Sequence, residues 1–287
     1  MKPLAPSPET LDRQLEIAVC RLADDLRFGQ DASPYAGSGI EYRQSRVFVD
    51  GDSVRDIDWR VTARTGRFHV KEYEALKSMP AYLVVDTSAS MVASSIPLSK
   101  HKLAALLAGG LALAAMRRLS PVGLIAAGSR QLHSEPTLMR GRVFQWLHAL
   151  RKAGVQESTM LAQRLDQLEE LAPSRTLIIV LSDLHDPGAV PAIKRLAQRH
   201  DMLVLQLQDP AERGNLRGGM FHAIEAETGH PFVAHGRSRW FDHPQQQASK
   251  PLTAAAIDHL LLATDRPFVP ALRRLLSDRG GLVRNTR

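Results

Sequence analysis

Short apolar runs alternate with helical patterns along most of the chain. The runs at residues 81–86, 122–127, 176–182 and 202–208, and a weaker one at 259–263, are typical of buried strands. Apolar residues recur at helical spacing between them, at residues 100–119, 142–152, 160–171 and 190–199. Continuous apolar strands that alternate with helices predict a mostly parallel sheet covered on both faces. We therefore expect a doubly wound α/β fold.

The pattern changes near residue 80. Before it, an apolar stripe at residues 11–26 predicts a helix, residues 30–39 resemble a loop, and short β-like pieces follow at 46–49 and 67–70. Turn residues between Phe221 and Ala234 predict a hairpin appended to the sheet. The expected division is an N-terminal helix with a small β-containing extension at residues 1–80, and the α/β domain at residues 81–287.

The composition is that of a globular protein. The 287 residues are 44% hydrophobic and 23% charged, which excludes disorder for most of the chain. The longest apolar run, residues 103–116, contains Gly109 and Gly110 and is shorter than the roughly 20 residues of a membrane span, so it predicts a buried helix. A single cysteine, Cys20, and an N-terminus without a signal-like apolar core favour a cytoplasmic protein.

The net charge of +7 raises nucleic acid as a partner, but the charge is unevenly placed. Residues 1–80 hold 12 Lys and Arg against 13 Asp and Glu, whereas residues 266–287 hold six Arg against one Asp. Apolar residues in this tail recur at helical spacing, which predicts a basic C-terminal helix with solvated arginines. The distribution of charge therefore argues against nucleic acid as a partner, and a nucleic-acid-binding protein is kept only as the last of the alternatives.

Oxygen-bearing side chains follow the predicted strands. Asp86, Ser88 and Ser90 come after the first strand of the α/β domain, Asp183 follows a later one, and Thr159 or Ser158 is expected to cap a helix. Ligands of such folds gather beyond the carboxyl ends of the strands. A site of oxygen atoms alone suits Mg²⁺ or Mn²⁺ better than Zn²⁺. Each residue taken singly could instead cap a helix or brace a loop, so the prediction of a metal site depends on the five residues occurring together.

The segment Asp86-Thr87-Ser88-Ala89-Ser90-Met91, together with Thr159 and Asp183, resembles the metal-ion-dependent adhesion site (MIDAS) of von Willebrand factor A domains. The resemblance implies that the three hydroxyls of Ser88, Ser90 and Thr159 bind the metal directly. It also implies that Asp86 and Asp183 contact the ion through water or hold the loops. A protein partner would supply an acidic residue to complete the shell.

Two segments before the α/β domain resemble a more specific protein family. Residues 38–43 read SGIEYR and residues 50–64 read DGDSVRDIDWRVTAR, which is similar to the domain-of-unknown-function family numbered fifty-eight. Bacterial members of that family often accompany MoxR-type AAA+ ATPases. The resemblance thus implies a non-enzymatic adaptor that works with such an ATPase in chaperoning or maturation of another protein.

Residues 50–67 contain four Asp and four Arg. The favoured interpretation is a salt-bridged platform that packs Ile57 and Trp59 against the α/β domain. The alternative is a docking surface, because arginine suits acidic partners. The candidate partner-binding residues of that alternative are Asp52, Arg55, Asp58 and Arg64.

Enzymatic alternatives lack their motifs. An aspartyl-nucleophile phosphatase would place a second carboxylate where Ser88 stands, and the sequence has neither a G-x-S-x-G elbow nor a Walker A loop. We expect no catalytic residues, and a metal-assisted hydrolase that uses the same site is the alternative. His185, two residues after Asp183, is expected to be a surface or hydrogen-bonding residue.

Overall fold

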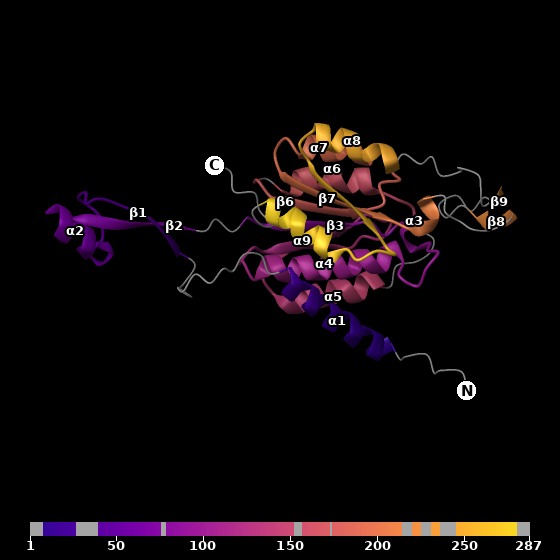
Figure 1. Ribbon diagram of the computed structural model, residues 1–287, viewed down its shortest axis with the longest axis horizontal. Helices are drawn as coiled ribbons and strands as arrows, with labels where there is room; N and C mark the ends of the chain where they lie inside the picture. The colour runs from indigo at the N-terminus through magenta and orange to yellow at the C-terminus, as the bar shows by residue number, and fades with distance from the viewer. Residues whose placement is uncertain are drawn as a thin grey trace. The chain divides into compact units, whose positions relative to one another are not determined.

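The computed structural model describes residues 8–26, 40–75, 79–151, 157–172, 174–213, 220–224, 231–235 and 245–279 (Figure 1). The chain divides into two compact units. The smaller is Gln30–Ser78, and the larger joins Met1–Gly29 to Met79–Arg287. The N-terminal helix α1 (Pro8–Asp25), which the sequence pattern groups with the extension, thus belongs to the larger unit.

The larger unit is built on a six-stranded sheet of order β10-β7-β6-β3-β4-β5. Its strands are β3 (Ala81–Val85), β4 (Val122–Ala126), β5 (His133–Thr137), β6 (Leu177–Ser182), β7 (Asp201–Gln208) and β10 (Asp258–Ala263). All neighbours pair in parallel except β5, which runs antiparallel to β4. This confirms the predicted α/β fold with a mostly parallel sheet. The sequence pattern misses β5 because it is polar and contains Pro136, which an edge strand tolerates.

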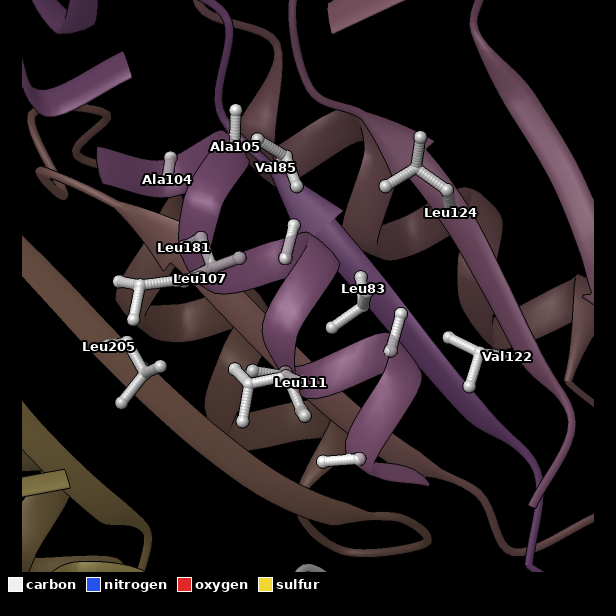
Figure 2. Packing of buried hydrophobic residues seen from close by; sticks show 14 of the residues in the cluster. Leu83, Val85, Ala104, Ala105, Leu107, Leu111, Val122, Leu124, Leu181 and Leu205 are labelled. Atoms are coloured by element: carbon white, nitrogen blue, oxygen red, sulfur yellow. The ribbon is translucent and has the colours of Figure 1, made fainter. Parts of the chain in front are cut away.

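One face of the sheet is covered by α1, α4 (Lys100–Met116), α5 (Arg140–Arg151) and α9 (Val269–Asp278). Figure 2 shows the side chains of α4, such as Leu107 and Leu111, packed over β3 and its neighbours. A Cβ on Gly110 would come within 2.6 Å of Leu22, so glycine allows α1 to approach α4 closely. The predicted buried helix at residues 103–116 is confirmed. No helix in the described ranges is both long and apolar enough to span a membrane.

The opposite face is covered by α6 (Leu161–Leu171), α7 (Ala189–Leu196) and α8 (Gln245–Ala254). Buried Leu165, Ile193 and Leu252 join Val180 and Val204 of the sheet in a second core. Figure 1 shows these helices in a layer on the far side of the sheet from α4. The candidate site lies in the loops that follow the carboxyl ends of the strands.

The predicted hairpin is present as β8 (Met220–Ile224) and β9 (Pro231–His235), which pair antiparallel. These strands form a two-stranded sheet of their own, separate from the six-stranded one.

The C-terminal helix also forms where predicted, as α9. Its Arg273 and Arg274 are exposed, as expected. Arg279, which follows the helix, is only 6% exposed and forms ion pairs with Asp201 and Asp258. The expectation of solvated arginines is therefore wrong at Arg279, because two carboxylates at the start of β7 and β10 hold it in the protein.

The smaller unit contains β1 (Ile40–Val47), the 3₁₀ turn η1 (Val54–Asp56), α2 (Trp59–Thr65) and β2 (His69–Ala75). Strands β1 and β2 pair antiparallel. The buried Ile57 makes an isolated bridge to Val70, which ties the segment between the strands to β2.

Candidate functional site

The site lies where two neighbouring parallel strands end. Asp86 directly follows β3 and Asp183 directly follows β6, and the backbone N–H of Asp86 donates to Leu181 O at 2.9 Å. Asp86 is 1% exposed and Asp183 is 0% exposed. Register between these strands thus brings together two carboxylates that are nearly 100 residues apart in sequence.

Asp86 is held by neutral donors. The Ser182 hydroxyl donates to its Oδ2 at 2.6 Å, and the backbone N–H of Ser88 donates to its Oδ1 at 3.0 Å. Burial, and next the negative charge of Asp183, raise the pKa of Asp86 to about 6. Asp86 has no cationic side chain as a hydrogen-bond partner among the residues that the structure describes. Its negative charge therefore lacks a counter-charge of its own.

Ser88 and Ser90 present adjacent hydroxyls, with their Oγ atoms 3.0 Å apart. Ser88 occupies the N-cap position of the short helix α3 (Ala89–Val92), but its side chain makes no capping hydrogen bond. Oxygen ligands at 2.0–2.1 Å from an octahedral Mg²⁺ are separated by about 3.0 Å at adjacent corners. The separation of the two hydroxyls thus fits two ligands of one such ion.

Thr159 does not act as the predicted helix cap. Helix α6 has Met160 at its N-cap position without a side-chain capping bond. Thr159 Oγ1 is buried and has no hydrogen-bond partner within the described part of the chain. Since a buried hydroxyl without a partner costs about 1–3 kcal/mol, Thr159 is the residue of the set that most requires a ligand.

The loop that carries Thr159 is fixed against the Ser88 loop. The backbone N–H of Ala89 donates to Glu157 O at 2.8 Å, and the Thr87 hydroxyl donates to Glu157 Oε2 at 2.7 Å. Arg130 forms an ion pair with the same carboxylate. A Cβ on Gly128 would lie 2.2 Å from both Thr87 Oγ1 and Glu157 Oε2, so this approach requires glycine. These contacts hold Ser88 and Thr159 at the same edge of the sheet.

Asp183 pairs with a lysine, Lys100, that the sequence pattern does not predict. Lys100 Nζ lies 2.6 Å from Asp183 Oδ2 and also pairs with Glu212, which belongs to the 3₁₀ turn η2 (Pro210–Arg213). His185 Nδ1 lies 3.0 Å from the same Asp183 oxygen, which fits the hydrogen-bonding role expected of His185. Lys100 is only 1% exposed. Its position at the start of α4 gives no signal in the sequence, because polar residues commonly begin helices.

The charges around Lys100 decide its protonation. Burial opposes its charge, but Asp183 and Glu212 together raise the pKa of Lys100 above its ordinary value. Burial likewise opposes the charge of Asp183, yet the Lys100 ammonium and the hydrogen bond to His185 hold the pKa of Asp183 well below its usual range. A cation at a helix N-terminus is disfavoured by the helix dipole, so these carboxylates must outweigh that cost.

Asp183, His185 and Glu212 also form a group whose ligand atoms lie within 4.8 Å of one another, a spacing that suits a metal ion. Lys100 already pairs with both carboxylates of this group and supplies a cation there. The candidate metal ligands that have no such cation in the described part of the chain are Asp86 and the hydroxyls of Ser88, Ser90 and Thr159.

The partner-binding candidates of the smaller unit fall into two pairs. Asp52 accepts two hydrogen bonds of 2.7 Å from Arg46, and Asp58 caps α2 by accepting from two backbone N–H groups. These carboxylates therefore act within the unit. Arg55 and Arg64 are exposed, as docking would require.

Comparisons with known proteins find one matching family and relatives in mycobacteria. Residues 44–240 match the family described as "Protein of unknown function DUF58". Uncharacterized proteins of Mycobacterium tuberculosis and Mycobacterium bovis are each 29% identical to this chain over 210 residues. The aligned region covers 70% of this chain and 65% of each relative, so the chain spans less than two thirds of the length of these relatives.

Proposed function

The chain belongs to the DUF58 family, and on that premise we propose that it is a non-enzymatic adaptor that binds Mg²⁺ or Mn²⁺ at the ends of β3 and β6. The ion would bind an acidic side chain of a protein partner. The resemblance of the Asp86 to Ser90 segment to the adhesion site of von Willebrand factor A domains supports this proposal, as does its place at the carboxyl edge of a parallel sheet.

The observation that carries the proposal is the hydroxyl of Thr159, which is buried and has no hydrogen-bond partner among the residues that the structure describes. A helix cap would satisfy this oxygen, but α6 does not use it. Ser88 likewise stands at a cap position without capping. Two hydroxyls that forgo the bonds typical of their positions are better explained as metal ligands than as loop braces.

The donor set fits a hard divalent ion. Ser88, Ser90 and Thr159 would bind it as neutral ligands, while Asp86 supplies the nearest uncompensated negative charge. Asp183, bound to Lys100, would act by bracing the loops and through water. Few carboxylates around the ion leave it electron-poor, and when bound it would supply a position for one further carboxylate oxygen.

The partner that we propose is a MoxR-type AAA+ ATPase, with a role in chaperoning or maturation of another protein. This step rests on the family resemblance of residues 50–64. The test is binding of this chain to the MoxR-type ATPase encoded in the same genome, measured with Mg²⁺ and with EDTA.

Asp86→Ala is expected to abolish the magnesium-dependent part of this binding. Asp166→Ala, at an exposed carboxylate on α6, is the matched control and is expected to leave it unchanged. Circular dichroism and urea unfolding verify that both variants fold. An Asp86→Ala variant that binds the ATPase with undiminished magnesium dependence would refute the site.

A metal-assisted hydrolase is the second candidate, favoured by one observation. A carboxyl group with a pKa raised by burial to about 6 can exchange protons near neutral pH, as a general acid or base must. Turnover of p-nitrophenyl phosphate that requires Mg²⁺ and is lost in Asp86→Ala would support this candidate over the adaptor.

A further inference from the structure

The smaller unit exposes an aromatic pair. Trp59, the first residue of α2, is 63% exposed, and Phe68, just before β2, is 57% exposed. Their rings meet edge to face, with centroids 6.5 Å apart and an interplanar angle of 82°. Within the smaller unit Trp59 thus lies at the surface, whereas Ile57 is buried. Large aromatic side chains placed together at a surface are typical of protein interaction sites.

The backbone beneath this pair is well fixed. Asp58 accepts hydrogen bonds from the N–H groups of Arg60 and Val61, and its other oxygen accepts from the Ser45 hydroxyl at 2.7 Å. Helix α2 then ends at Gly66 in the left-handed conformation that glycine favours. Trp59 thus lies on a short helix that is capped at both ends, and Phe68 lies just before β2, so little ordering of the backbone is needed when a partner binds.

The charge that surrounds the pair is positive. Four exposed arginines lie on α2 and the turns that flank it: Arg55, Arg60, Arg64 and Arg67. None of the four forms an ion pair with any residue that the structure describes. The nearby carboxylates of Asp52 and Asp58 are used within the unit, by Arg46 and by the helix cap. Exposed Asp50 and Asp56 offset only part of this charge.

We propose that these residues form a docking surface for an acidic protein segment that also carries apolar side chains. We call it the α2 surface and define it as Trp59, Phe68 and the four arginines Arg55, Arg60, Arg64 and Arg67. Tryptophan and arginine are the residues most enriched at the energetic centres of protein interfaces. The arginines complement a negatively charged partner, and the aromatic pair can pack against apolar side chains of the same partner. A polyphosphate chain fits less well, because Asp50 and Asp56 lie in the same segment.

This inference does not rest on the proposed metal site. The α2 surface lies wholly within Gln30–Ser78, and the strand-end donors lie wholly within the larger unit. Docking at the α2 surface is therefore expected to persist in EDTA, whereas binding at the strand ends is not. Failure of either proposal leaves the other measurable.

The test is fluorescence anisotropy on the full chain in EDTA with a labelled synthetic peptide of Glu, Asp, Leu and Phe residues. Poly-glutamate, oligo-dT and phosphatidylglycerol vesicles serve as comparison probes. We expect Trp59→Ala and the double variant Arg60→Glu with Arg64→Glu each to weaken peptide binding about tenfold or more. The matched control, Arg140→Glu with Arg142→Glu on exposed positions of α5, is expected to leave binding unchanged.

Accessibility of Trp59 is a second measurement. The difference in acrylamide quenching between the wild type and Trp59→Phe reports Trp59 alone, and we expect it to be accessible in the free chain and shielded by the peptide. Peptide binding that ignores both α2 variants, or that the α5 control weakens equally, would overturn the proposal. So would tighter binding of oligo-dT or of vesicles, or a Trp59 already shielded in the free chain.

Discussion

The ends of β3 and β6 pose the same electrostatic problem and meet it differently. Each places a buried aspartate at the carboxyl edge of the sheet, Asp86 after β3 and Asp183 after β6. Asp183 pairs with the ammonium of Lys100 and keeps a pKa below its usual range despite burial. Within the described part of the chain, the hydrogen-bond donors to Asp86 are neutral groups, and burial with the charge of Asp183 raises its pKa to about 6.

This difference in charge compensation indicates which of the two strand ends can bind an external cation. At β6 the cation is part of the protein, and a second one would meet the repulsion of Lys100. At β3 the described residues that donate to the carboxylate are neutral, and hydroxyls that make no capping bonds lie in the neighbouring loops. An arrangement that is unfavourable in the free protein and would be relieved by a divalent ion is typical of a binding site rather than of a structural brace.

The largest effect on stability is expected when Lys100, the cation that pairs with Asp183, is replaced. Lys100→Met removes the ammonium that pairs with the buried Asp183 and with Glu212, so we expect a loss of about 3–5 kcal/mol in the free energy of unfolding. Urea denaturation measures this loss. Lys102→Met, at an exposed position on the same helix, is the matched control and is expected to change stability by less than about 0.5 kcal/mol. A Lys100→Met variant as stable as this control would contradict the comparison.

At the end of β3, by contrast, we expect a substitution to increase the free energy of unfolding. Asp86→Asn removes a buried charge that repels Asp183, so in EDTA at pH 7.5 the variant should be more stable than the wild type. The rise in the pKa of Asp86 from 3.8 to about 6 sets the gain at no more than about 3 kcal/mol.

The pH dependence follows from that pKa shift. The folded state binds the Asp86 proton more tightly than the unfolded state, so the contribution of Asp86 to stability is present below pH 3.8 and is lost as pH rises through about 6. The advantage of Asp86→Asn over the wild type should therefore grow between about pH 4 and pH 7. Urea unfolding at a series of pH values tests this, and an advantage that is constant or shrinks with pH would disprove the assigned charge repulsion.

The smallest effect on stability is expected at Thr159. Because its buried hydroxyl has no partner among the described residues, Thr159→Val should not destabilise the protein in EDTA, and loss of the unpaired hydroxyl should raise the free energy of unfolding by about 1 kcal/mol. The same substitution should weaken Mg²⁺ binding about tenfold, which corresponds to about 1.4 kcal/mol. Thr159→Ser retains the oxygen and should bind nearly as well as the wild type. A large loss of stability in Thr159→Val would indicate a structural hydroxyl instead.

The sequence predicts the parts of this site that depend on local pattern. Apolar runs locate β3 and β6, and the carboxyl ends of parallel strands place Asp86 and Asp183 at one edge. Spacing after β3 likewise predicts Ser88 and Ser90 as a pair. Local pattern suffices here because strand ends and tight loops are fixed by nearby residues.

The rest depends on contacts between distant segments. Lys100 meets Asp183 and Glu212 only after α4 packs on the sheet, and nothing in the residues around Lys100 predicts that pairing. The helix cap predicted at Thr159 is wrong for a related reason. A hydroxyl before a helix usually caps it, and only the structure shows that α6 begins without using this one.

The most direct test of the central claim is calorimetric titration of the wild type and Asp86→Ala with Mg²⁺ and with Mn²⁺, in the presence and absence of acetate. We predict saturable binding in the wild type that acetate strengthens, because a carboxylate oxygen completes the shell, and loss of that binding in Asp86→Ala. Absence of binding by the wild type in every condition, or equal binding by Asp86→Ala, would contradict the claim that the end of β3 is a metal site.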